Sequence, residues 1–187
     1  MEAGSEVFEI TESNPGPGDF LEPVEFILAE HYRQRLLCDG LVKLTETMEL
    51  GPVTALAASL QSFLDRDLRL HLEDEEQDLF PLLRKRAQPE DNITDILDLL
   101  SEEHGLDRDL VDFLLEDLAV LAGGTQIANP IRFLVNVREF AETQRRHLAW
   151  ENALLLPVAR RRLTQVDLAG LGRSMAARRG IDLGAED

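Results

Sequence analysis

Four long stretches of the chain carry apolar residues in steps of three and four, the spacing that places side chains on one face of a helix. Breaks rich in glycine and proline separate these stretches, at Gly51-Pro52, Pro89-Glu90-Asp91 and Gly123-Gly124 through Pro130. The expected helices span about 23–49, 53–87, 90–121 and 130–163, followed by a shorter amphipathic helix over about 165–179.

The connections between these helices are short, which favours antiparallel neighbours. Strand patterns of period two are almost absent. The sequence therefore predicts an all-α fold, an up-down-up-down four-helix bundle with a short extra C-terminal helix. A chain of 187 residues has room for one well-buried core. We expect a disordered acidic tail over 1–22, the bundle over 23–163, and a short helix and tail over 164–187.

The formal charge of −17 argues against nucleic-acid and membrane partners, because an acidic surface gains nothing from releasing their counterions. The sequence has no run of 18 apolar residues, and its acidic N-terminus does not resemble a signal peptide. We therefore expect a cytoplasmic protein. Its single cysteine, Cys38, lies on an apolar stripe and is expected to be a small buried hydrophobe.

The chain contains an internal repeat. The segment from His71 to Pro81 aligns with that from His147 to Pro157, matching a histidine, a glutamate four residues later and the final proline. At nearly the same offset, Glu30-His31 aligns with Glu103-His104. Two similar helical hairpins packed about a pseudo-twofold axis would bring equivalent side chains to the centre. Every histidine of the chain occupies a matched position.

The matched residues predict a metal site. Glu75 and Glu151 lie on apolar faces, where an unpaired carboxylate is costly and a cation would remove the penalty. Each lies four residues after a histidine, so both side chains of a pair lie on the same side of the helix. Imidazole with carboxylate suits iron, manganese or zinc.

Six ligands are too many for one structural zinc ion, which takes four. Two ions use the set fully. We expect His31 and His71 on one ion, His104 and His147 on the other, and Glu75 and Glu151 as bridges. Sites would remain for solvent, an oxo or hydroxo bridge, or a small ligand.

These residues resemble the hemerythrin-like, or HHE cation-binding, domains. The segment His71-Leu-Glu-Asp-Glu-Glu-Gln-Asp-Leu-Phe-Pro81 is similar to that family's second-helix motif, and the other histidines follow in the family's order over about 23–163. The resemblance implies an up-down four-helix bundle around a non-haem di-iron centre. It also implies a role in oxygen carriage, in oxygen or redox sensing, or in iron handling.

Two positions depart from the oxygen-carrying hemerythrins. Their third helix has a second histidine four residues after the first, where this chain has Arg108. Their last carboxylate lies five residues after its histidine, whereas Glu151 lies four residues after His147. Reversible oxygen carriage is therefore not the expectation. Asp107, Glu103 or water could replace the missing ligand.

The sequence also gives expectations for some neighbouring residues. Glu73, Asp74 and Glu76 are expected to form a solvated acidic face. Pro81 and Pro157 should kink their helices just past the ligands. Trp150 could pack near the site or face outward.

Three classes of function are compatible with the predicted bundle and metal site. The favoured one is a metal-binding protein whose di-iron centre binds or senses dioxygen, nitric oxide or peroxide, or handles iron. A di-iron oxidase or peroxide-consuming enzyme is the second, and four imidazoles beside two carboxylates tilt against it. The third is a structural or partner-binding bundle. The sequence does not indicate a protein partner.

Overall fold

The computed structural model describes residues 14–48 and 53–183, except for the side chains of residues 106 and 107. Its first long helix is α1 (Pro23–Thr47), and its third is α5 (Thr94–Ala122). The second is a continuous series of α2 (Thr54–Ser62), the π-helix η2 (Phe63–Leu68), α3 (Arg69–Asp74), the π-helix η3 (Glu75–Leu79) and α4 (Phe80–Arg86). The fourth consists of α6 (Pro130–Trp150), the π-helix η5 (Glu151–Leu155) and α7 (Leu156–Arg162).

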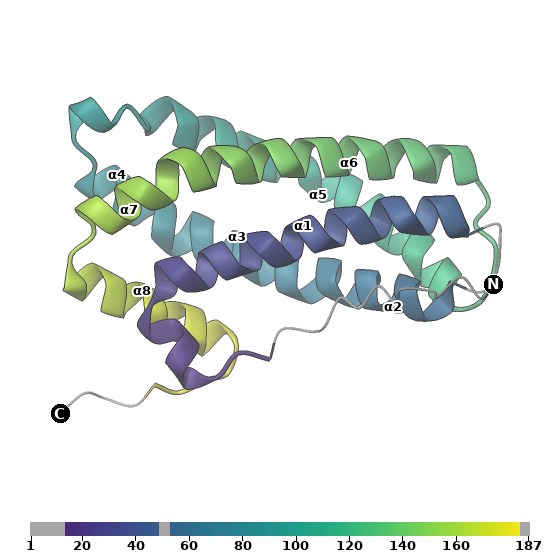
Figure 1. Cartoon of the computed structure of the whole chain (residues 1–187), viewed down its shortest axis with the longest axis horizontal. Coiled ribbons are helices and arrows are strands. Elements are labelled where there is room, and N and C mark those ends of the chain that lie inside the picture. Colours follow the sequence, from purple (N-terminus) through teal and green to yellow (C-terminus); the bar gives the residue numbers. More distant parts are fainter. Residues whose placement is uncertain (1–13, 49–52, 184–187) are drawn as a thin grey trace, which may run out of the picture.

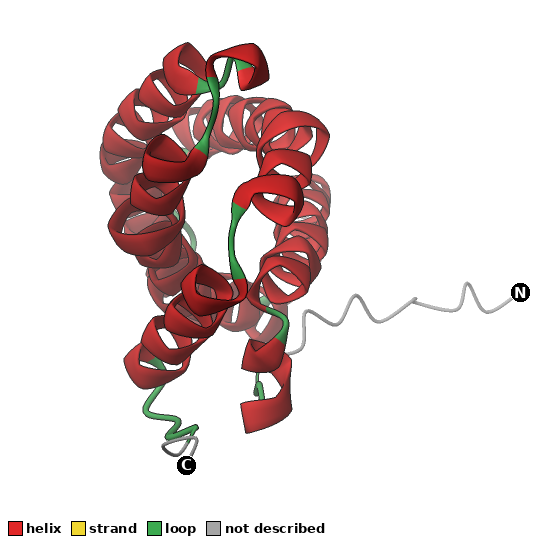
Figure 2. Ribbon diagram, turned by 90° about the vertical axis from the view of Figure 1, so that its left-hand side faces the viewer, coloured by secondary structure: helices red, strands yellow, loops and turns green. Residues whose placement is uncertain are grey.

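These four rods form an up-down-up-down bundle (Figure 1). α1 packs most extensively on α6, α2 packs on α5, and α5 in turn contacts α6. Viewed from the end, the helices surround a common axis, and the described residues include no strand (Figure 2). The prediction of an all-α bundle with an extra C-terminal helix is confirmed. Within the described ranges, no helix is both long and apolar enough to cross a membrane.

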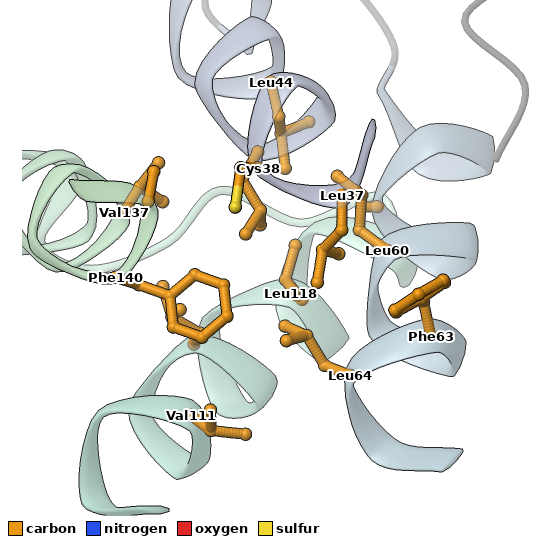
Figure 3. Packing of buried hydrophobic residues seen from close by; sticks show 14 of the residues in the cluster. Leu37, Cys38, Leu44, Leu60, Phe63, Leu64, Val111, Leu118, Val137 and Phe140 are labelled. Atoms are coloured by element: carbon orange, nitrogen blue, oxygen red, sulfur yellow. The ribbon is translucent and has the colours of Figure 1, made fainter. Parts of the chain in front are cut away.

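Two apolar clusters form the core. One lies around the second half of α1, with α2, η2 and the first half of α6 (Figure 3). Cys38 belongs to it and is fully buried, as expected, and burial raises the pKa of its thiol to about 12. The other cluster gathers the first half of α1 with α4, α7 and α8. Burying one large aliphatic side chain contributes about 1.5–3 kcal/mol, so both clusters stabilise the bundle. Between them lies a layer of buried polar residues.

The extra C-terminal helix is α8 (Gln165–Arg178), which packs against α1 and against η1, a 3-10 helix over Pro17–Leu21. Phe20 of η1 is buried, which differs from the expectation of a disordered tail extending to residue 22. An aromatic anchor fixes this segment, because Phe20 contacts Phe26 of α1 and the Arg179 guanidinium lies over both rings. The rest of the expected N-terminal tail, residues 1–13, lies outside the described residues.

A short 3-10 helix, η4 (Pro89–Asp91), joins α4 to α5. The Asp91 carboxylate accepts hydrogen bonds from Arg161 and Arg162 of α7, so it connects this turn to the end of the fourth rod. These bonds hold the pKa of Asp91 well below its usual range.

Candidate metal centre

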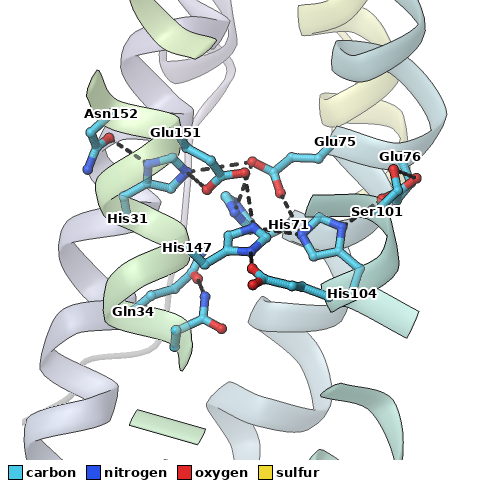
Figure 4. A network of polar contacts seen from close by, with 12 residues as sticks. His31, Gln34, His71, Glu75, Glu76, Ser101, His104, His147, Glu151 and Asn152 are labelled. Atoms are coloured by element: carbon cyan, nitrogen blue, oxygen red, sulfur yellow. Dashed lines mark hydrogen bonds and ion pairs between the residues drawn. The ribbon is translucent and has the colours of Figure 1, made fainter. Parts of the chain in front are cut away.

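The polar layer between the two clusters contains all six residues that the sequence singles out. Each rod contributes one histidine, and the second and fourth rods each add one glutamate (Figure 4). Each of the six is at most 3% exposed: His31, His71, Glu75, His104, His147 and Glu151. Side chains from four separate helices therefore converge at one buried point.

The six residues form two groups of four potential ligands. His31 and His71 form one group with both glutamates, and His104 and His147 form the other with the same two glutamates. Within each group, one ligand atom from every residue lies within 4.8 Å of the rest. Since both carboxylates belong to both groups, the geometry matches two adjacent cation positions better than one.

Each carboxylate directs one oxygen to each group. Oε1 of Glu75 lies 3.6 Å from Nε2 of His31 and 3.4 Å from Nε2 of His71, while its Oε2 lies 3.6 Å from Nε2 of His104. Oε2 of Glu151 lies 3.4 Å from Nε2 of His31, and its Oε1 lies 3.2 Å from Nε2 of His147. This is the disposition that a bridging carboxylate requires.

The spacing of these atoms suits ligation. Nitrogen and oxygen ligands lie about 2.0–2.2 Å from an ion such as zinc, which places neighbouring ligand atoms about 3–3.5 Å apart. Nε2 of His104 lies 2.9 Å from Nε2 of His147. Both oxygens of Glu75 and Nε2 of His31 have no hydrogen-bond partner among the described residues. Buried polar atoms normally have a partner, and here a cation fits that role.

The two glutamates occupy equivalent places in their rods. Glu75 begins the π-helix η3 and Glu151 begins η5, and in each case the residue five positions later donates its backbone N–H to the glutamate carbonyl. A proline follows one residue further on, at Pro81 and Pro157. A proline inside an α-helix removes one hydrogen bond and clashes with the carbonyl four residues earlier. The wider π turn lets the rod continue past each proline.

Outer hydrogen bonds orient three of the histidines. Nδ1 of His31 lies 2.7 Å from Oδ1 of Asn152. Nδ1 of His104 lies 2.7 Å from Oε1 of Glu76, and Nδ1 of His147 lies 3.0 Å from Oε2 of Glu103. These oxygens accept, so each Nδ1 carries a proton, and each Nε2 faces the centre, where it can offer its lone pair to a cation once it carries no proton. The outer hydrogen bonds thereby orient the three rings for metal binding.

Without a cation, the buried layer does not favour two ionised carboxylates. Burial, together with the charge of Glu151, raises the pKa of Glu75 well above its usual range. Burial also opposes ionisation of Glu151, but the positive charge of His147 outweighs it and holds the pKa of Glu151 below its usual range. Burial lowers the pKa of His31 and His71, which keeps both imidazoles neutral. Two carboxylates can be ionised together here only with added positive charge.

Of the residues proposed to replace the missing histidine, Glu103 lies outside the centre. Glu103 accepts hydrogen bonds from Arg146 and His147, so it supports a ligand from outside the centre. Arg108 is exposed on α5. The Asp107 side chain lies outside the described residues, and Trp150 is 44% exposed.

The prediction of a solvated acidic face on the second rod is wrong for two of its three residues. Glu73 is exposed, but Glu76 accepts hydrogen bonds from His104 and Ser101, and the first of these lowers the pKa of Glu76. Asp74 is fully buried and forms ion pairs with Arg178 and Arg179, at 2.7 and 2.8 Å. Sequence reasoning missed these partners because they come from α5 and from the end of α8.

A comparison with protein families bears on this arrangement. The hemerythrin HHE cation-binding domain model matches residues 22–159. The chain belongs to this family. No curated protein matches it significantly. The match includes residues of all four rods and all six converging side chains, so this HHE domain has a His/Glu cluster able to hold a metal cation.

Proposed function

We propose that this HHE domain binds two non-haem iron ions and serves to bind or sense dioxygen, nitric oxide or peroxide, or to handle iron. The observation that carries the proposal is the sharing of Glu75 and Glu151 between two groups of four ligands. A structural zinc site would need only four protein ligands. Nitrogen with carboxylate oxygen is a donor set that suits iron, with manganese or zinc as less favoured occupants.

Each ion would be held by two imidazoles and two carboxylate oxygens: His31 and His71 on one side, His104 and His147 on the other. When bound, such a pair of ions supplies redox chemistry and sites for an oxo or hydroxo bridge and a small ligand. The protein binds and orients them. Asn152, Glu76 and Glu103 hold the imidazole rings, and the two apolar clusters exclude bulk water.

The balance of ligands supports binding rather than catalysis. Bundle enzymes that activate dioxygen have carboxylate-rich sites. This site combines four imidazoles with two carboxylates. We therefore assign the domain a binding, sensing or storage role, with an oxidase or peroxide-consuming enzyme as the alternative that turnover of added peroxide would reveal.

Elemental analysis paired with absorption spectra tests the proposal. Purified protein should contain close to two iron ions per chain and, after exposure to dioxygen, display the absorption of an oxo-bridged ferric pair. Spectra recorded before and after exposure to dioxygen test identity and reactivity together. One zinc ion per chain, or no metal at all, would refute the di-iron assignment.

A further inference from the structure

A cavity of about 400 Å³ opens between the second rod and α5 and reaches one half of the proposed centre. His104 lines it directly. Gln144, three residues before His147 on α6, also lines it. The cavity therefore approaches the His104–His147 half, while the residues of its wall do not include His31 or His71.

The wall of this cavity is largely apolar at depth. Its apolar members come from four different elements: Leu64, Leu68, Leu72, Val111 and Phe140. The position that would hold a further histidine in an oxygen carrier is Arg108, whose exposed side chain also lines the cavity. The cavity therefore opens on the side of the proposed centre where Arg108 stands in place of the oxygen carriers' further histidine.

The charges around the passage decide which ligands it suits. Two arginines, Arg69 and Arg108, face three acidic residues, Glu73, Glu76 and Asp112. Arg69 forms an ion pair with Asp112 at 3.5 Å, so the carboxylate of Asp112 balances its charge. The lining is acidic overall, as is the whole chain at −17. Such a surface repels small anions and leaves uncharged molecules unaffected.

A buried amide pair lies where the cavity meets the centre. Nε2 of Gln144 donates to Oε1 of Gln34 at 2.6 Å, and both side chains are at most 4% exposed. Nε2 of Gln34, which Figure 4 draws with the Gln144 side chain, has no hydrogen-bond partner among the described residues. A buried amide with unused hydrogen-bonding capacity can contact a polar molecule bound next to it.

We infer that small uncharged ligands, such as nitric oxide or dioxygen, reach the ion of the His104–His147 half through this cavity and bind beside the Gln34–Gln144 amide pair. The inference rests on the proposed di-iron centre. It adds three statements to the proposed function: which half of the centre binds the ligand, that the ligand arrives through this cavity, and that anions are excluded.

Association of nitric oxide with the reduced, iron-loaded full chain tests the route. Val111→Phe fills the cavity from within, and Arg108→Trp covers its mouth with an exposed side chain that folding should tolerate. Each should slow nitric oxide association by about tenfold or more, within the range over which single changes alter association rates. Matched controls are Val135→Phe and Arg138→Trp, at exposed positions of α6 that do not line the cavity. Unchanged association in Arg108→Trp would overturn the route.

Azide tests the charge argument on the same samples. Raising the ionic strength should speed azide association, because salt screens the acidic lining, and should leave nitric oxide association unchanged. Equal salt dependence of the two ligands would overturn the exclusion of anions.

Gln144→Met tests the amide pair. It keeps the length of the side chain and removes the amide, so nitric oxide should dissociate faster while association stays the same. An unchanged dissociation rate would overturn the role of the amide pair.

Iron content, measured first on every variant, separates this inference from the proposed function. Wild-type protein without iron would refute both. Normal iron content together with insensitivity to the cavity variants would refute only the route.

Discussion

At the scale of single residues, the centre depends on side chains that would not touch a metal. Glu76 donates no ligand atom to either group of four, yet its Oε1 accepts the Nδ1 proton of His104 at 2.7 Å. Ring orientation and basicity of a ligating histidine depend on such a partner. The functional unit is therefore larger than the six converging residues.

Replacing Glu76 with alanine should weaken metal binding by about 10- to 100-fold, the usual consequence of losing an outer partner of a ligating histidine. The matched change is Glu73→Ala, which removes the same charge from an exposed position on the same rod. Competition with a chelator of known affinity measures both. Equal weakening in the two variants would mean that Glu76 acts only through its charge.

The proposed bridging role of the glutamates predicts a different pattern of metal loss. Glu75→Ala or Glu151→Ala would remove an oxygen ligand from both proposed ions at once, since each residue belongs to both groups of four. Each should lose more metal than Asp107→Ala, measured as ions bound per chain by elemental analysis. Similar metal content in all three variants would show that the bridge assignment is wrong.

The six central residues could be predicted from sequence because histidine and glutamate on an apolar stripe have few structural explanations. Their outer partners could not. Asp74 and Glu76 flank Glu75 in a run of acidic residues, and nothing local distinguishes them from the exposed Glu73. Their partners, Arg178 and His104, lie 104 and 28 residues away in the chain.

At the scale of elements, the docking of α8 depends on one close approach. A Cβ built on Gly172 would lie 2.1 Å from the backbone oxygen of Phe20, whereas one built on Gly170, two residues earlier in α8, meets nothing within 4 Å. Only a glycine lets α8 lie against η1 at this point. The boundary of the ordered region before residue 23 could not be predicted, because this contact joins the two ends of the chain.

The two glycines give opposite predictions for the same substitution. Gly170→Ala should stabilise the protein by about 1 kcal/mol, the difference in helix propensity between the two residues. Gly172→Ala should destabilise it, since backbone of either α8 or η1 must move to relieve the overlap. Denaturant unfolding measures both changes. If Gly172→Ala is as stable as Gly170→Ala, α8 does not dock on η1 in solution.

The glycine and proline breaks in the sequence predicted where the helices end. They did not predict the π-helices inside the second and fourth rods. Both rods contain a glutamate followed six residues later by a proline, and in both the intervening segment is a π-helix. The repeat therefore preserves a backbone distortion as well as ligand positions. In sequence, each proline predicted a kink and did not indicate the π-helix that precedes it.

At the scale of the whole molecule, the polar layer joins all four rods between two apolar clusters. The clusters stabilise the bundle at either side, while the layer itself contains carboxylates whose burial is unfavourable. Glu75, with its raised pKa, is the clearest case. A cation bound there would turn an unfavourable layer into a connection among the four rods, so metal binding and folding stability should be coupled.

Removing metal should therefore lower the unfolding temperature of the whole bundle. A ligand present at 100 times its dissociation constant stabilises a protein by about 2.7 kcal/mol for one site. For a chain of this size, about 1 kcal/mol shifts the unfolding temperature by about 2–4 °C, so a chelator should lower it by about 5–10 °C or more. The control is the Glu75→Ala, Glu151→Ala double variant, in which chelator should have no effect because no bridge remains. Calorimetry with and without chelator measures both proteins. A wild-type unfolding temperature indifferent to chelator would indicate that the clusters alone stabilise the fold.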